Sequence, residues 1–284
     1  MAIVDVECSQ RLGQELDAVV AAGALQLPML PDVVMRVTTL CNDPDCDARQ
    51  LAELIRADQS LMAHLLREAN SAAMGSRVPI ASLQLAVSRI GLGRIRAIAL
   101  EVACKTVVFR VDGRESLMRD LFRHALAVGL TAQEIARSRR MNVEEAFTAG
   151  LLHDVGRPVA IEAVLGLASR DGLAPDDDDL ETICHPRHAA IGAELVASWG
   201  LPERLQVVAR HHHDPEQAGP AEALARVVRL ADEISSTCFE VDAAVARTEF
   251  DDDPDVRALN LYPDDVMALL AHREAVLAQL EAIG

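Results

Sequence analysis

Aromatic side chains are scarce in this sequence, and their scarcity narrows the class of fold. Phe, Tyr and Trp make up 2% of the 284 residues, and Trp199 and Tyr262 are each the only residue of their type. Half of the residues are nevertheless apolar, mainly Ala, Leu, Val and Ile, which excludes a disordered chain. Ala and Leu lead the intrinsic helix scale, and β alternation is not convincing anywhere. The composition therefore predicts an all-α fold, and the length allows one large domain or two smaller ones.

The features of a secreted or membrane-spanning protein are also missing. The six cysteines, at positions 8, 41, 46, 104, 184 and 238, form no CxxC pair. Without a secretory signal, we expect them to be reduced thiols. The first residues lack the basic start and apolar run of a signal peptide, and no stretch of about 18 uncharged apolar residues occurs. We therefore expect a cytoplasmic protein without a membrane span.

Positive charge is in short supply as well. The formal net charge is −17 and the sequence pI is about 4.9. Broad nucleic-acid binding needs clustered Lys and Arg, and so does attraction to an anionic membrane, so we expect neither partner. A local basic cluster at Arg137, Arg139 and Arg140 is better explained as a helix C-terminus that complements its own dipole.

The spacing of apolar residues divides the chain into helices and loops. Two prolines in the segment LPMLP, at 27–31, end a first helix over 10–24. Further helices are predicted at 33–40, 48–57, 58–70, 82–90, 95–109, 116–138, 143–153, 158–165, 187–198, 203–211, 221–237 and 263–282. The stretch 112–115 is a candidate boundary between lobes. Two acidic stretches, 176–179 and 249–255, are expected to be solvated surface loops.

The placement of histidines is the most informative feature. Seven of the nine lie between positions 124 and 213, and His153 is followed by Asp154 at the end of an apolar helix. An imidazole and a carboxylate from adjacent residues can grip a divalent metal ion, and Gly156 would let the backbone turn tightly beside them. The alternative is that the pair only caps the helix and satisfies backbone groups.

Other candidate ligands are distant in the sequence, so only a helical bundle could bring them to His153 and Asp154. They are His124, His188, His212, His213 and Asp232. Together, the seven residues could hold one or two ions of Fe, Mn or Zn, with Asp154 bridging the two, and could orient a phosphate ester and water. The alternatives are a core histidine at 124 and a solvated polar cluster at 188, 212 and 213. His211, His185, His64 and His272 are not expected to be ligands.

Several motifs closely resemble the HDOD family, a divergent branch of the HD-domain superfamily. They are LPMLP at 27–31, LIRAD at 54–58, LLREANSA at 65–72, AVSRIG at 86–91, AFTAGLLHD at 146–154 and WGLP at 199–202. The resemblance implies an N-terminal helix (1–24), an HDOD domain (25–238) and an acidic loop with a C-terminal helix (239–284). The HDOD domain would be a helical bundle, with an N-terminal lobe (25–112) packed on an HD-like lobe (113–238).

The resemblance also implies a bacterial signal-transduction module that binds a signalling protein or a small ligand such as a nucleotide, without catalysis. The complete ligand set keeps a second hypothesis open, a metal-dependent phosphohydrolase acting on a nucleotide or cyclic dinucleotide. Two departures from the related HD-GYP phosphodiesterases count against that hypothesis. Arg157 stands where those enzymes carry Lys, and Asp214 to Gln217 replace the Gly-Tyr-Pro segment. Arg157 could still hold a phosphate in its planar fork.

Two further features have structural explanations that we prefer. Asn70 ends a helix, where its amide can cap carbonyl groups, although a ligand contact is the functional alternative. The C-terminal helix carries an apolar stripe, Val266, Leu269, Leu270, Val276, Leu277 and Leu280, that favours packing over a role in a homodimer.

Overall fold

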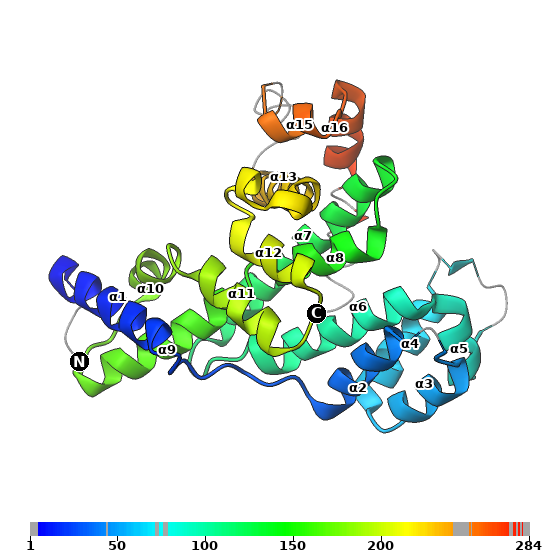
Figure 1. Ribbon diagram of the computed structural model, residues 1–284, viewed down its shortest axis with the longest axis horizontal. Coiled ribbons are helices and arrows are strands. Elements are labelled where there is room, and N and C mark those ends of the chain that lie inside the picture. Colours follow the sequence, from blue (N-terminus) through cyan, green and yellow to red (C-terminus); the bar gives the residue numbers. More distant parts are fainter. Residues whose placement is uncertain are drawn as a thin grey trace. The chain divides into compact units, whose positions relative to one another are not determined.

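The chain folds into helices, as its composition predicts. A computed structural model describes residues 5–43, 45–71, 74–75, 79–240, 250, 252–272, 275–276, 278 and 280. No strand occurs within these residues (Figure 1), so the all-α prediction is confirmed. The helices form two compact units, a smaller unit of residues 29–107 and a larger unit of residues 1–28 and 108–284.

The smaller unit is built from short amphipathic helices with polar caps. They are α2 (Asp32–Cys41), α3 (Ala48–Ile55), α4 (Gln59–Ala69), α5 (Leu83–Ile90) and α6 (Leu92–Ala103), which continues as the π-helical segment η2 (Cys104–Val108). Side chains cap the starts of α3, α4 and α5 by accepting hydrogen bonds from backbone N–H groups, and these side chains are Asp47, Asp58 and Ser82.

Asn70 closes α4 as a structural clamp. Its Nδ2 donates to the Leu66 carbonyl at 2.7 Å and to the Ile80 carbonyl at 2.9 Å, and its Oδ1 accepts the Ile80 N–H at 2.7 Å. These bonds fix the chain that returns toward α5, where Ile80 packs with Ala69 and Ala86. The capping role predicted for Asn70 is therefore confirmed.

Glu101 is a buried carboxyl in the smaller unit, and it should make that unit sensitive to pH. Burial raises the pKa of Glu101 to about 7. The positive charge of Arg94 opposes this rise, and the negative charge of Glu68 adds to it. Between pH 4.5 and 7 the folded state thus keeps a proton that the unfolded state has lost, so stability falls as the pH rises through this window. At 1.36 kcal/mol per pKa unit, the loss is roughly 3 kcal/mol.

We expect Glu101→Gln to remove most of this pH dependence. Hydrogen exchange of peptides from 29–107 should show the variant better protected than the wild type at pH 8 and similar to it at pH 4.5. Glu53→Gln removes an exposed carboxylate from the same unit and should leave both values unchanged. Equal protection of Glu101→Gln and wild type at pH 8 would contradict the expectation.

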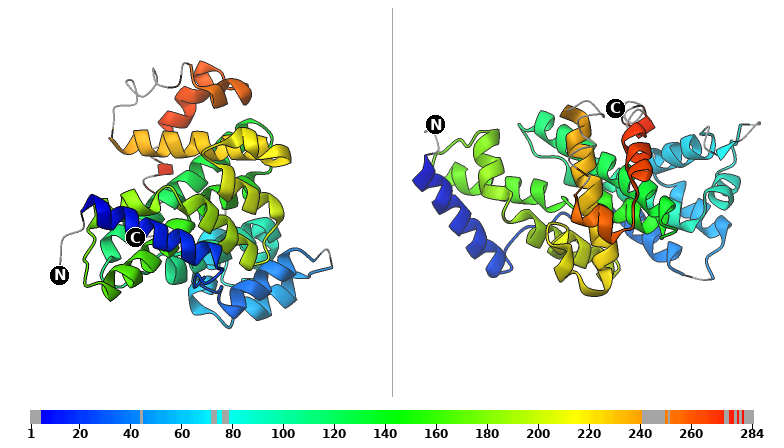
Figure 2. Two further views of the ribbon diagram at one scale, coloured as in Figure 1. Left: turned by 60° about the vertical axis from the view of Figure 1, so that its left-hand side comes forward. Right: turned by 90° about the horizontal axis from the view of Figure 1, so that it is seen from above.

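The larger unit surrounds the histidines with longer helices. It contains α1 (Val6–Ala21), α7 (Glu115–Ser138), α8 (Val143–Leu152), α9 (Gly156–Arg170), α10 (Asp177–Cys184), α11 (His188–Ser198), α12 (Glu203–His211), η3 (Pro215–Gln217), η4 (Gly219–Ala221), α13 (Glu222–Glu240), α15 (Pro254–Ala258) and α16 (Pro263–Ala271). Helix α1 packs on α9 and α10 (Figure 2). There, Arg187 pairs with both carboxylate oxygens of Asp17, at 2.7 and 2.8 Å. The N-terminal helix is thereby tied to the residue that precedes His188.

Two glycine contacts bring the helices of this unit unusually close together. A Cβ atom on Gly150 of α8 would lie 2.8 Å from the Cα of Gly129 on α7. A Cβ atom on Gly156, where α9 begins, would lie 2.1 Å from the His188 carbonyl oxygen and 2.5 Å from the Gly192 nitrogen of α11. Glycine is therefore needed at position 156 because two backbones approach closely there. The tight turn that the sequence suggested does not explain the glycine.

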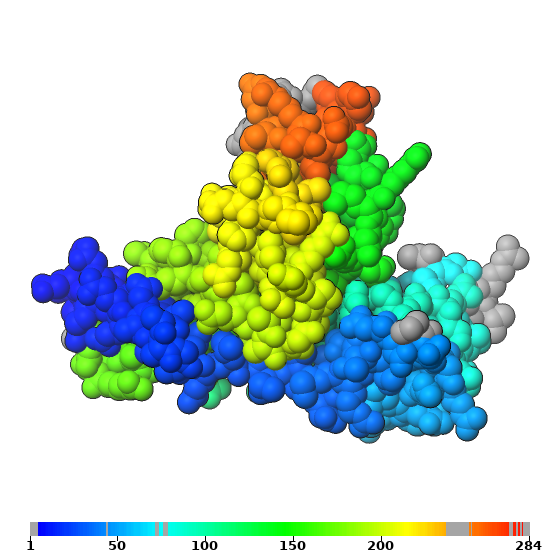
Figure 3. All heavy atoms as spheres, viewed as in Figure 1, coloured from blue at the N-terminus to red at the C-terminus, as the bar shows by residue number. Residues whose placement is uncertain are grey.

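Asp176 to Asp178 and Asp252 are exposed, as predicted for the two acidic stretches, but the first stretch begins a helix and the second contains the buried Asp255. Asp176 and Asp179 form a capping box that begins α10, because each side chain accepts the other's backbone N–H. In the second stretch, Asp253 caps α15, and Asp255 is completely buried. The Asp255 carboxylate accepts hydrogen bonds from Arg226 Nη1 at 2.6 Å and from Arg229 Nε at 2.5 Å. In the space-filling view the orange segment around α15 lies on α13 (Figure 3), and α16 packs on α7.

The end of α7 and the C-terminal segment agree with the sequence-based predictions. Arg137 lies in the last turn of α7, as expected for a charge that complements a helix dipole. The apolar stripe of the C-terminal segment is buried at Val266, Leu269, Leu270, Val276 and Leu280, which confirms its packing role, while Leu277 lies outside the described residues. Among the described helices, none is long and apolar enough to cross a membrane.

Candidate metal centre

All seven candidate ligands meet in the larger unit. His124 comes from α7, His153 and Asp154 follow α8, and His188 is the first residue of α11. His212 and His213 follow the last turn of α12, and Asp232 lies within α13. Residues more than 100 positions apart thus share one cluster, as the bundle hypothesis required. Whether they bind metal remains a prediction.

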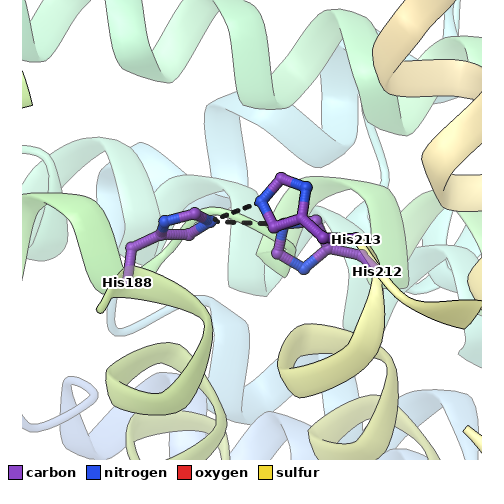
Figure 4. Close-up of side chains that lie close together, drawn as sticks. All are labelled: His188, His212 and His213. Carbon is purple, nitrogen blue, oxygen red and sulfur yellow. Dashed lines mark hydrogen bonds between the residues drawn. The ribbon is translucent and has the colours of Figure 1, made fainter. Parts of the chain in front are cut away.

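The cluster consists of two groups of donors. His124, His153 and Asp232 form the first group, and His188, His212 and His213 form the second, while His153, Asp154 and His212 lie close enough to form a set that overlaps both. Within the first, His124 Nε2 lies 3.0 Å from Asp232 Oδ1. Within the second, His188 Nε2 lies 3.3 Å from His212 Nε2 and 3.1 Å from His213 Nε2 (Figure 4).

Asp154 lies between the two groups. Its Oδ1 is 3.0 Å from His188 Nε2 and 3.7 Å from His212 Nε2. Its Oδ2 is 3.6 Å from His153 Nε2 and 3.1 Å from Arg157 Nη1. One oxygen therefore faces each group, which is the arrangement that a bridging carboxylate needs.

The helix ends set the orientation of three imidazole rings. The Nδ1 atoms of His153, His188 and His212 lie 2.7, 2.5 and 2.9 Å from the carbonyl oxygens of Gly150, His185 and Ala209, each three residues earlier. A bond to a carbonyl requires a proton on Nδ1, so in the neutral ring Nε2 carries a lone pair. All three lone pairs point into the cluster.

These lone pairs make the cluster electrostatically incomplete without a cation. His153 Nε2 is buried and has no hydrogen-bond partner. The Nε2 atoms of His188 and His212 face each other, although each ring has its proton on the other nitrogen. Buried acceptors that face acceptors are costly, and a metal ion bound by several of them would remove the cost. The residues present therefore fit a divalent metal ion.

The charges of the cluster agree with this fit. Burial, followed by the nearby His153, lowers the pKa of His212 to about 3, so this ring is neutral and able to ligate at neutral pH. Burial opposes ionisation of Asp154, but His153 and His188, when they carry protons in place of a metal ion, together with Arg157 hold the pKa of this carboxyl well below its usual range. Imidazole and carboxylate donors suit Fe, Mn and Zn alike.

One histidine that the sequence did not suggest also borders the centre. The ring of His185 lies 5.3 Å from that of His188 and 5.6 Å from that of His213, between ring centroids. Its Nδ1 is 3.4 Å from Glu181 Oε1. His185 lies only three residues before His188, in the turn between α10 and α11, and this short spacing was a signal that could have drawn attention to it.

A helical bundle with a His-Asp pair and converging histidines defines an HD-like protein. The HDOD domain matches residues 27–215, and the chain belongs to the HDOD domain family. The family resemblance noted in the sequence is thereby confirmed.

Solved structures share this fold. An HDOD domain protein of unknown function from Geobacter sulfurreducens is 26% identical, with a TM-score of 0.65 and coverage of 98% of this chain and 97% of that one. A protein from Shewanella amazonensis, named provisionally as a metal-dependent phosphohydrolase, is 23% identical, with a TM-score of 0.71 and coverage of 92% and 99%.

A relative with a named activity matches a smaller region. Ribonuclease Y from Geotalea uraniireducens is 31% identical over 130 residues, which are 45% of this chain and 20% of that protein. The curated relatives are longer proteins, and the chain spans less than half of their length.

Proposed function

We propose that this protein is a bacterial signal-transduction module of HDOD type whose larger unit holds one or two divalent metal ions and binds a phosphate-bearing ligand such as a nucleotide. The observation that carries the proposal is the set of inward-facing Nε2 lone pairs on His153, His188 and His212, fixed by backbone carbonyls around Asp154. A bound ion would supply positive charge for phosphate oxygens in an otherwise acidic protein. A signalling protein that binds this chain could then respond to whether the ligand is bound.

The test begins with untagged protein. Elemental analysis should find about one or two Fe, Mn or Zn per chain, because the donors form two groups. Calorimetry with a panel of nucleotides and cyclic dinucleotides should then show binding that disappears after chelation. A protein without metal, or one whose nucleotide binding survives chelation, would count against the proposal.

Hydrolysis of a phosphate ester is the second candidate, and the position of Asp154 favours it. A carboxylate with one oxygen toward each group of histidines is suited to hold two ions side by side. The argument against hydrolysis is that Arg157 is paired with Asp154 and Glu181, so it can contact a substrate only after Glu181 has moved away. Release of p-nitrophenol from bis-p-nitrophenyl phosphate by metal-loaded protein, lost on chelation, would support hydrolysis, and binding without turnover would support the regulatory function.

A further inference from the structure

The edge of the metal centre holds one of the chain's own carboxylates. Arg157 donates from Nη1 to Asp154 Oδ2 at 3.1 Å and from Nη2 to Glu181 Oε2. The other oxygen of Glu181 lies 3.4 Å from His185 Nδ1. Glu181 is thus held between a guanidinium group and an imidazole, both of which can donate hydrogen bonds.

This edge is continuous with the proposed metal ligands and is open to solvent. Arg157 bonds to Asp154 directly, and the ring of His185 borders those of His188 and His213. The side chains of Glu181 and His185 are 50% and 55% exposed, whereas that of Arg157 is 17% exposed. A ligand can therefore reach the guanidinium from outside by taking the place of the Glu181 carboxylate.

Helix α10 does not depend on Glu181 for its position. Its apolar face, Leu180, Ile183 and Cys184, is buried, and the capping box of Asp176 and Asp179 begins the helix. A half-exposed ion pair adds little to stability. The Glu181 side chain can therefore turn away while the helix stays in place.

We propose that Arg157 and His185 form an anion-binding subsite beside the metal centre, and that Glu181 occupies this subsite until a phosphate group displaces it. A guanidinium group donates hydrogen bonds to carboxylate and phosphate oxygens alike, so the Glu181 carboxylate that Arg157 Nη2 binds stands in for a phosphate group. The inference rests on the proposed function, since the phosphate belongs to the ligand of the metal centre. Glu181 then acts as a built-in competitor that lowers the affinity for phosphate.

The test compares two variants that lose the same charge from the same helix. Glu181→Gln removes the competitor, whereas Asp178→Asn removes an exposed carboxylate one turn away. The probe is inorganic phosphate, titrated by calorimetry into protein whose metal content has been measured for each variant. If Glu181 occupies the subsite about nine-tenths of the time, its removal tightens phosphate binding about tenfold, and Asp178→Asn changes it much less.

A double variant locates the effect. Adding Arg157→Gln to Glu181→Gln should abolish the tenfold gain, because the guanidinium group provides the charged donor that Glu181 now occupies. A Glu181→Gln protein with normal metal content and unchanged or weaker phosphate affinity would overturn the subsite and leave the proposed function standing. A gain equal to that of Asp178→Asn would also overturn it, because the effect would then be one of net charge. Protein without metal would refute the proposed function, and the same comparison of variants would still decide on the subsite.

Discussion

Asp154→Ala should abolish metal binding. Among the described residues, Asp154 is the carboxylate that contacts histidines of both groups, and its side chain is almost completely buried. Mutation of residues that hydrogen-bond to metal ligands typically lowers metal affinity by about 10–100-fold. Loss of a direct, central ligand should therefore lower the affinity by more than about 100-fold. Elemental analysis of dialysed, untagged protein should find the wild type loaded and the variant empty.

Thermal unfolding provides a second measurement of the same change. A ligand that binds only the folded state stabilises it, so chelation should lower the melting temperature of the wild type and leave that of Asp154→Ala unchanged. Asp120→Asn, which removes an exposed carboxylate from α7, is the matched control and should behave as the wild type. Metal retained by Asp154→Ala at wild-type stoichiometry would show that the histidines hold the ion without the bridge.

The largest effect on stability is expected from Asp255→Ala. The Asp255 side chain has no exposed surface and binds the guanidinium groups of Arg226 and Arg229 on α13. Removing one partner of a buried ion pair leaves the other charge uncompensated, which costs about 3–5 kcal/mol. The loss should be moderated by Glu222 and Glu216, which also contact Arg226.

Urea unfolding followed by the fluorescence of Trp199 can measure this loss. Trp199 is the only tryptophan and lies in the larger unit, so its signal reports the unit that contains Asp255. Asp252→Ala removes a carboxylate that is 95% exposed from the same acidic stretch, and its unfolding midpoint should stay near that of the wild type. If the two variants shifted the midpoint equally, Asp255 would contribute no more than a surface charge.

The difference between Asp252 and Asp255 illustrates what the sequence could and could not predict. The His-Asp pair and the helix ends that carry the other ligands were visible because each lies in a local pattern. The burial of Asp255 depends on two arginines 26 and 29 residues earlier on another helix, and nothing near Asp255 indicates it. A run of acidic residues is ambiguous in the same way, because the Asp176 to Asp179 segment that suggests a loop also contains the donors and acceptors of a capping box.

The role of Glu181 was hidden for a related reason. Arg157 and Glu181 lie on different helices, and their contact depends on how α9 and α10 pack. The sequence could show that a guanidinium was present, but not that a carboxylate of the same chain already bound it.

The glycine contacts have a consequence for recognising working centres among related chains. Asp154 and His188 face each other across the point where Gly156 meets the backbone of α11. A single added methyl group at this point would force the two backbones apart and carry the two ligands with them. A relative could therefore keep every histidine and aspartate and still have lost the centre by gaining one carbon atom, so an inventory of ligands alone would count it as intact.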